Sequence, residues 1–289
     1  MGYRFKAGEK SITEGVRRIA AAEFAQIRLS LSDPSLPLAR KVHEGRKATK
    51  RLRALLRLVS PVFPGAAEEI AALRTAASEL SALRDTGALL EAIDGLDLPG
   101  DLSGTLRTAL AARPAASAAA HRRLLAAFAA AMDAAAQRAE SWTLDKEGWN
   151  ALAPGLTRAH RRLRKARAEA RRAGHEDPVH DLRKRAKDHW YQTLLLRGAF
   201  PDVMNGYAEA GEHLCEDLGR WRDLGLLETA VGGLSARKLA AADAETVLTV
   251  IASARRRALR RAFRTAGRLL AESPDAYAAR LKAWWTPRR

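Results

Sequence analysis

The sequence predicts an all-α protein made of two helical bundles with about four helices each, and three observations favour this fold. Alanine, leucine and arginine are abundant, and all three stabilise helices. Glycine and proline lie mostly between segments of helical periodicity rather than inside them. A pattern that begins at residue 42 returns at residue 179, which indicates that one helical unit occurs twice in the chain.

The internal repeat is the most specific of these observations. Residues 42–64 read VHEGRKATKRLRALLRLVSPVFP and residues 179–201 read VHDLRKRAKDHWYQTLLLRGAFP, with 8 identities in 23 aligned positions. A second block, LSALRDTGALLEA at 80–92, aligns with LGRWRDLGLLETA at 218–230. The two offsets are nearly equal, 137 (179 − 42) and 138 (218 − 80). A unit of this length suits a duplicated helical bundle better than a solenoid.

Turn residues predict the order of the elements. Within a single domain over 1–289, repeat one spans about 11–140, a linker about 141–153 and repeat two about 154–285. The helices predicted in repeat one are 11–31, 38–60, 65–93 and 103–140. Those predicted in repeat two are 154–173, 178–198, 202–232 and 239–271, followed by a short closing helix over 274–285.

Charge and targeting signals narrow the class of function. The chain has 50 Lys and Arg against 33 Asp and Glu, a net charge of +17, which predicts a polyanionic partner such as nucleic acid or a phosphate polymer. The single cysteine, Cys215, excludes an intrachain disulfide. The N-terminus lacks the apolar segment of a signal peptide, and no apolar run approaches the roughly 20 residues that span a bilayer. We therefore expect a cytoplasmic protein without a membrane partner.

The helix predicted over 38–60 carries a basic stripe opposite an apolar one. At about 100° per residue, one face holds a histidine, arginines and lysines. Its members are His43, Arg46, Lys47, Lys50, Arg53 and Arg57. Such a stripe is often only a solvated helix face. The repeat argues for anion binding instead, because the second copy keeps the same residue types in register, namely His180, Arg183, Lys184 and Lys187.

Two details of the second copy bear on its role. Asp177 is the predicted N-cap and Pro178 the first helical residue, which would place His180 in the first turn, where free amides favour anions. Arg185 and His189 interrupt the apolar face, so the packing of that face is uncertain from the sequence.

Other arginines extend the basic surface. On the helix over 239–271, Arg257, Arg260 and Arg264 share one face with Arg261 and Arg268. Such a row favours either a bound polyanion or acidic residues from another helix. On the helix over 154–173, Arg158 and Arg162 lie on one side, and Arg18 occupies the related part of repeat one. The RDxG segments at Arg84–Asp85 and Arg222–Asp223 suggest interhelical ion pairs, with Gly87 and Gly225 allowing close approach.

Catalysis is not expected. His43–Glu44 and His180–Asp181 resemble dipeptides of metal phosphohydrolases, but such sites need further His or Asp ligands, and the chain has only seven histidines. A Walker-type glycine-rich loop is absent from the sequence, and no Ser–His–Asp set can be argued. We expect no catalytic residue, metal site or cofactor.

Taken together, these motifs resemble the CHAD family (conserved histidine α-helical domain) over nearly the whole chain. The resemblance rests on YRFKAGEKSITEGVRRI at the start, both VHxxRKxxK stretches, both RDxG segments and GLTRAHRRLRKARAEA. It implies two four-helix bundles related by pseudo-two-fold symmetry. It also implies binding of inorganic polyphosphate on a central basic groove and a location at polyphosphate granules. Two departures from the family pattern are His160, where a tyrosine is expected, and Thr86, where a second aspartate is common.

The resemblance carries a set of binding residues onto this chain. The matches within the two stripes are His43, Arg46, Lys47 and Lys50, and His180, Arg183, Lys184 and Lys187. Further basic residues carried over are Arg18, Arg158, Arg162 and Arg257. A dense, base-free polyanion suits many arginines and few aromatics, whereas single-stranded nucleic acid favours exposed aromatic platforms. Non-specific binding of duplex DNA and docking of acidic proteins stay open as alternatives.

Overall fold

The structure is a computed structural model, and it describes most of the chain. It leaves out residues 1, 7, 8, 10, 81–84, 112–116, 174, 237 and 287–289, and the side chains of 85–88 and 118. The described part contains eleven α-helices, one short 3-10 helix and no strand. This confirms the predicted all-α class.

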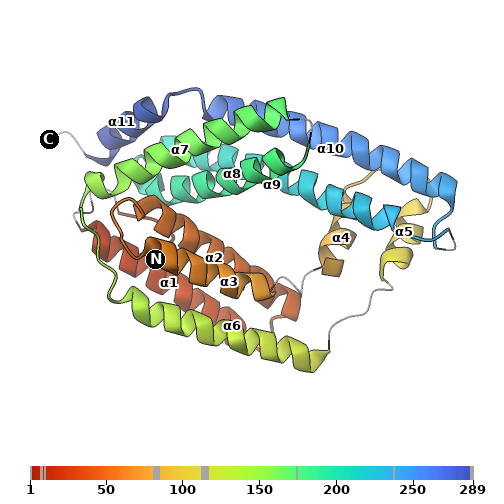
Figure 1. Cartoon of the computed structure of the whole chain (residues 1–289), viewed down its shortest axis with the longest axis horizontal. Helices are drawn as coiled ribbons and strands as arrows, with labels where there is room; N and C mark the ends of the chain where they lie inside the picture. The colour runs from red at the N-terminus through yellow and green to blue at the C-terminus, as the bar shows by residue number, and fades with distance from the viewer. Residues whose placement is uncertain are drawn as a thin grey trace.

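The helices follow one another along the chain as Figure 1 labels them. The first six are α1 (Ile12–Ser32), α2 (Leu38–Val59), α3 (Ala66–Glu79), α4 (Asp85–Asp94), α5 (Leu102–Ala111) and α6 (Ala118–Ala139). The others are α7 (Trp149–Arg172), α8 (Asp177–Leu196), the 3-10 helix η2 (Arg197–Ala199), α9 (Pro201–Gly232), α10 (Ala241–Leu269) and α11 (Pro274–Trp285).

Eight of these helices form two groups of four. In the first, α1 packs on α2, α2 on α3, α3 on α6 and α6 on α1. In the second, α7, α8, α9 and α10 pack in chain order. Figure 1 shows the groups as a lower and an upper arm that meet at the left, where α2 contacts α7 and α8. One apolar core runs through this meeting point, because residues of α2, α7, α8 and α11 belong to the same buried cluster.

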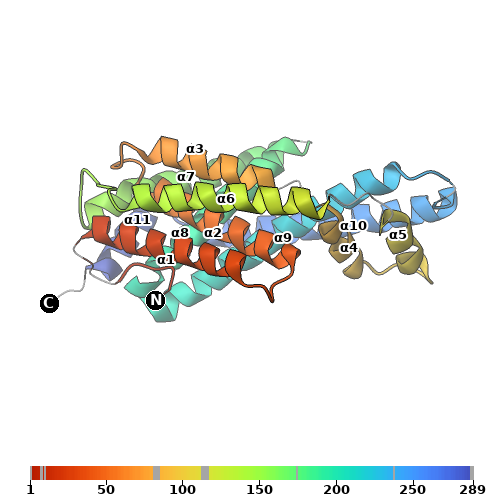
Figure 2. The same cartoon turned by 90° about the horizontal axis from the view of Figure 1, so that it is seen from below.

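Two of the predicted helices are wrong, because each is split. The segment predicted as one helix over 65–93 forms α3 and α4, and the segment over 103–140 forms α5 and α6. The short pair α4 and α5 leaves the first group and packs against the far ends of α9 and α10, as Figure 2 also shows. Ile93 and Leu106 bury their side chains there with Leu224 and Ile251. This tertiary packing outweighs the local helix propensity that predicted one continuous helix in each segment.

The predicted linker over 141–153 is also too long, because α7 begins at Trp149 with Pro154 inside it. Proline costs the helix one hydrogen bond. Packing offsets this cost, since Ala151 and Leu152 are buried in the core and Trp149 lies 6.3 Å from Trp285, ring centre to ring centre.

A close crossing of α2 and α7 fixes how the two groups meet. A Cβ atom on Gly155 would lie 1.7 Å from the carbonyl oxygen of Leu58, so only glycine allows this approach. One turn further, a guanidinium nitrogen of Arg158 donates to the carbonyl of Arg57 at 3.0 Å and to the hydroxyl of Ser60.

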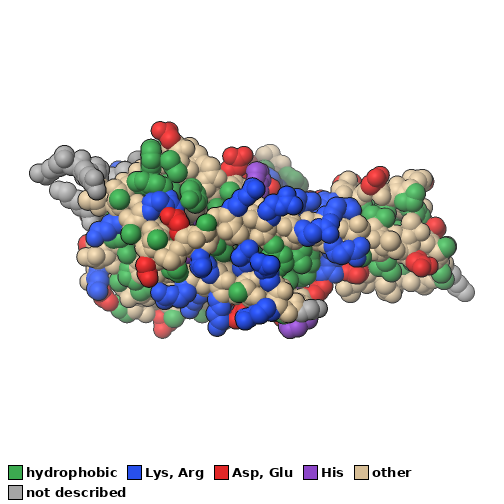
Figure 3. All heavy atoms as spheres, turned by 90° about the horizontal axis from the view of Figure 1, so that it is seen from above, with side chains coloured by type: hydrophobic (Ala, Val, Ile, Leu, Met, Phe, Trp, Pro, Cys, Tyr) green, Lys and Arg blue, Asp and Glu red, His purple; other side chains and the backbone are tan. Residues whose placement is uncertain are grey.

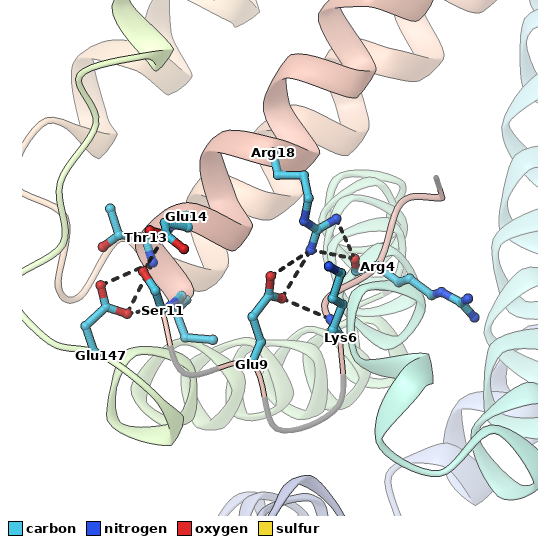
Figure 4. A network of polar contacts seen from close by, with 9 residues as sticks. Arg4, Lys6, Glu9, Ser11, Thr13, Glu14, Arg18 and Glu147 are labelled. Atoms are coloured by element: carbon cyan, nitrogen blue, oxygen red, sulfur yellow. Dashed lines mark hydrogen bonds and ion pairs between the residues drawn. The ribbon is translucent and has the colours of Figure 1, made fainter.

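The N-terminal segment is anchored at the start of α1 (Figure 4). The hydroxyl of Ser11 caps the helix by accepting from the amide of Glu14 at 3.2 Å, and the carboxylate of Glu147 accepts from the amide of Thr13. Arg18 pairs with Glu9 at 3.0 Å. Residues far apart in the sequence therefore hold this end of the first group in place.

A buried histidine pair lies inside the second group. His160, at the position where the family pattern has tyrosine, stacks on Tyr277 with ring centres 4.5 Å apart. Its Nδ1 lies 3.4 Å from Nε2 of His189, and its Nε2 lies 3.1 Å from the carbonyl oxygen of Glu272. Burial lowers the pKa of both rings, that of His189 to about 3. The side chain of His189, whose packing the sequence left uncertain, therefore belongs to the core.

Candidate polyanion-binding site

The first basic stripe, which we call the α2 stripe, lies beside α3. It comprises His43, Arg46, Lys47 and Lys50. Arg46 donates to the carbonyl of Ala77 on α3 at 2.9 Å, and Lys47 lies 3.9 Å from the carboxylate of Glu44. His43 is exposed. These contacts anchor one edge of the stripe to α3.

Further along α2 the basic residues enter a cleft between α2, α7 and α8, which we call the junction cleft. Its lining contains Arg57, Gly155, Arg158, Ala159, Arg162, Arg185, Asp188 and Gln192. Four arginines from three helices thus surround one carboxylate. Arg57 forms an ion pair with Asp188 at 2.6 Å. Arg185 forms an ion pair with Asp181, on its own helix, at 3.0 Å.

Arg53 is not part of the lining, but it adds a fifth positive charge beside it, close enough to act on Arg57 and Asp188. Burial lowers the pKa of Arg53, and the positive charges of Arg57, Arg74 and Arg46 lower it further, while Asp188 opposes them. Its Nε atom is buried without a hydrogen-bond partner among the residues that the structure describes. Burial followed by the charge of Arg162 likewise lowers the pKa of Arg158.

The lone carboxylate does not neutralise this cluster. Burial raises the pKa of Asp188, and the nearby Arg57 only partly counters that effect. Five arginines crowded around one acid are stabilised most by an anion from outside, because every added negative charge relieves their mutual repulsion. Arginine also presents a fork of donors that matches phosphate oxygens. The arrangement therefore suits a phosphate-rich ligand.

The second stripe, the α8 stripe, lies in a different setting, beside α9. It comprises His180, Arg183, Lys184 and Lys187. The ammonium of Lys187 sits 4.6 Å from the ring centre of Trp190, and His180 meets Trp221 edge-on at 5.2 Å. His180 also lies 3.9 Å from the carboxylate of Glu176. Only Lys184 is fully exposed in this stripe.

The predicted helix start before His180 is wrong by one residue. The helix begins at Asp177, so Glu176 rather than Asp177 holds the N-cap position. The amide of His180 donates to the carbonyl of Glu176 at 3.0 Å. This amide is therefore already used within the helix and is not a free anion-binding donor.

Both stripe histidines are biased towards the neutral form. Partial desolvation of the ring by its surroundings is the main cause of the lowered pKa of His43, although the side chain is exposed, and the neighbouring Arg40, Lys47 and Lys50 contribute to it. Burial also lowers the pKa of His180, with help from Arg222, while Glu176 acts in the opposite direction. A bound polyanion would raise both pKa values.

The remaining predicted residues fall into two groups. Arg158 and Arg162 belong to the junction cleft. Arg18 is occupied by Glu9 and by the carbonyl of Arg4, in the network of Figure 4. The α10 arginines do not line the junction cleft but lie exposed on α10, namely Arg257, Arg260 and Arg264.

Sequence reasoning missed the cleft as a unit. Arg53 and Arg57 were recognised in the first stripe, but Arg185 was interpreted only as an interruption of an apolar face. The helical projection of a single helix cannot show that Arg185 and Arg162 converge from two other helices on Arg57. The close-packing glycine in the segment APGLTR is the one sequence signal for this crossing.

The structure describes only one of the two RDxG segments in full. Arg84 lies outside the described residues, as does the side chain of Asp85. In α9, Arg222 pairs with its own sequence neighbour Asp223 at 3.1 Å, so the predicted interhelical pair is wrong there. Gly225 instead makes room for the guanidinium of Arg255.

Two further findings concern the part of the chain that the structure describes. It contains no group of three or more His, Cys, Asp or Glu residues that could hold a metal ion. None of its helices combines the length and the hydropathy that crossing a bilayer requires.

Comparison with known proteins gives the family. Fold and site define an all-α protein with a basic cleft where two helix groups meet. The model of the CHAD domain matches residues 18–232, and the chain therefore belongs to the CHAD family. The crystal structure of the CHAD domain from the plant Ricinus communis is similar over 97% of this chain and 96% of that one, with a TM-score of 0.55 and 22% identity. A search of curated proteins returned no match.

Proposed function

We propose that this protein binds inorganic polyphosphate, and that the junction cleft is the centre of the binding site. The observation that carries the proposal is the set of five arginines around Asp188, two of which, Arg53 and Arg158, have lowered pKa values through burial and mutual repulsion. Membership of the CHAD family points to the same ligand. The α2 stripe extends the site from Arg53 towards His43.

A polymer of phosphates fits this cleft better than nucleic acid does. Each repeat unit carries charge, and there is no base to accommodate, so closely spaced arginines can be satisfied along one strand. Aromatic side chains, on which bases would stack, do not line the junction cleft. Duplex DNA and acidic proteins would have to bind through exposed charge alone.

The remaining expectations form part of the same proposal. The two helix groups descend from a duplicated unit with pseudo-two-fold symmetry and together make one domain. The protein works in the cytoplasm as a binding module without catalysis or cofactor, at polyphosphate granules. The aligned VHxxRKxxK stretches, which begin at Val42 in α2 and at Val179 in α8, support the duplication.

The test is a competition between long-chain polyphosphate and duplex or single-stranded DNA of matched charge, at about 150 mM salt. A cleft variant, Arg53→Gln with Arg162→Gln, runs beside a control with the same loss of charge, Arg122→Gln with Arg123→Gln, both exposed on α6. We expect polyphosphate to displace both forms of DNA. The cleft variant should bind polyphosphate at least about tenfold more weakly than the wild type, while the affinity of the control variant should change little.

Two results would overturn the proposal. If DNA competes as well as polyphosphate at equal charge, the protein is a general binder of polyanions. If cleft and control variants lose affinity equally, net charge rather than the cleft binds the polymer.

A further inference from the structure

We propose that four arginines on α10 form a second contact surface that only long polyphosphate chains reach, and so make the protein selective for long chains. The surface, which we call the α10 row, comprises Arg257, Arg260, Arg264 and Arg268. This inference rests on the proposed function, because it extends the route of the same polymer beyond the junction cleft.

The α10 row differs from its neighbours in having no acidic partner. On the same helix, Arg261 pairs with Asp217 at 2.8 Å, and Arg255 pairs with Glu176 and Glu228. In the part of the chain that the structure describes, no carboxylate pairs with any member of the row, and Arg257 bonds only to Ser253 of its own helix. Acids thus balance the arginines that face α9, while the outward row stays unbalanced.

The members of the row are aligned for a linear ligand. They recur every three or four residues, so they lie on one face of a straight helix. From Arg257 to Arg268 the face is about 16 Å long, from a rise of about 1.5 Å per residue. All four side chains are exposed. Repulsion between like charges at this spacing destabilises a helix slightly, and a bound polyanion would remove that repulsion.

Helix α7 supplies the connection between the cleft and the row. Arg162 lies in the cleft lining, and its neighbours Arg161 and Lys165 continue around the exposed side of α7. Arg164 reaches α10 and donates to the carbonyl of Leu270 at 2.5 Å. Figure 3 shows the result, a band of Lys and Arg side chains across the face that α7 and α10 form. A chain that leaves the cleft over α7 therefore arrives at the α10 row.

The experiment compares a short polyphosphate of about eight units with a long one of about one hundred, using the full-length protein. In the row variant, Arg257, Arg260, Arg264 and Arg268 are each changed to Gln, which keeps helix propensity nearly constant. The control changes four exposed basic residues elsewhere, namely Arg122, Arg123, Lys238 and Lys282, to Gln. Affinity and its dependence on salt concentration are measured for both chain lengths.

We expect the row variant to bind the short chain as the wild type does and the long chain about tenfold more weakly. The salt dependence of long-chain binding should fall by about 3 in log–log slope, close to 0.7 for each of four lost phosphate contacts. The four-residue control should behave as the wild type with both chains, beyond a small uniform loss.

Each of five outcomes would overturn one of the two proposals. If the row variant binds long chains normally, or loses short and long chains alike, the extended route is wrong. If the wild type binds two long chains at once, the row is a separate site and the continuous route is wrong. If neither length binds the wild type, or the Arg53 and Arg162 variant binds both normally, the proposed function itself fails.

Discussion

The α2 stripe and the α8 stripe match in sequence, yet the structure places them in different surroundings. Along α2, the basic residues continue through Arg53 and Arg57 into a cleft where arginines outnumber acids. Along α8, the matching positions lie against the aromatic rings of Trp190 and Trp221. The positions equivalent to Arg53 and Arg57 in the second repeat are Trp190 and Leu194. Repeated motifs therefore need not make equal contributions to a site.

The difference assigns separate roles to the stripes. A cation–π contact with Trp190 partly satisfies the charge of Lys187, and the ring of His180 packs edge-on against Trp221. The α2 residues lead into unbalanced charge, where an anion gains most. We infer that α2 supplies most of the binding free energy and that α8 supplies mainly structure, together with the outward Lys184.

The largest effect should come from Gly155→Ala, which disrupts the close crossing of α2 and α7 beside the junction cleft. Its Cβ would meet the carbonyl of Leu58 at 1.7 Å, so α2 and α7 must move apart. We expect a loss of about 3 kcal/mol in the free energy of unfolding, as for overpacked interiors, and weaker polyphosphate binding. Chemical denaturation measures the first effect and titration with polyphosphate the second.

Gly206→Ala is the matched control for that substitution. Nothing lies within 4 Å of the added Cβ at this helical position of α9, so the change should be neutral or stabilising by about 1 kcal/mol. Equal stability of the two variants would show that the crossing tolerates a wider separation than the structure has.

The sequence predicted the parts of the fold that local patterns encode. The helices predicted over 11–31, 38–60 and 239–271 match α1, α2 and α10 within two residues at each end. The splits at α3–α4 and α5–α6 could not be predicted in the same way. They depend on where Ile93 and Leu106 find an apolar partner, and that partner lies on α9 and α10, more than a hundred residues away in the chain.

A second prediction concerns two histidines on the same helix, His180 in the α8 stripe and His189 in the core. Burial lowers the pKa of His189 to about 3 in the folded protein. Below the ordinary histidine pKa, the unfolded chain therefore binds a proton at this residue, whereas the folded protein does not. Stability should therefore be complete above about pH 7 and fall as the pH decreases, by about 1.4 kcal/mol per pH unit for each such group.

Denaturation between about pH 7 and pH 5 tests this prediction. His189→Gln should make the dependence on pH shallower, because the titrating ring is gone, whereas His180→Gln should change it little. A wild-type stability that stays constant over this range would mean that the buried pair is protonated without cost.

A third prediction compares the stripes directly by removing two charges from each region. Lys184→Gln with Lys187→Gln in the α8 stripe should weaken polyphosphate binding about threefold, less than the Arg53 and Arg162 pair in the cleft does. The physical reason is that Lys187 already has a partner in Trp190. An α8 variant that binds as weakly as the cleft variant would make the two stripes equivalent.

The helices that carry the predicted residues follow from the sequence, but the way in which these residues converge does not. The two stripes lie on α2 and α8, and Arg158 and Arg162 lie on α7 in the lining of the junction cleft. Which of these residues converge depends on the angle at which helices cross, and a single glycine contact, Gly155 on Leu58, sets that angle here. Helical periodicity contains no information about it.

The smallest expected effect concerns pH and shows which stripe touches the ligand. Surrounding cations and burial keep the pKa values of His43 and His180 low in the free protein, and a bound polyanion raises the pKa of any histidine it contacts. Affinity should therefore be constant at high pH and increase as the pH falls through the raised pKa, by roughly threefold between about pH 7.5 and pH 6. If α2 carries most of the contact, His43→Gln removes this increase and His180→Gln leaves most of it. The reverse pattern would transfer the main contact to α8, and an increase that survives in both variants would come from a group outside the two stripes.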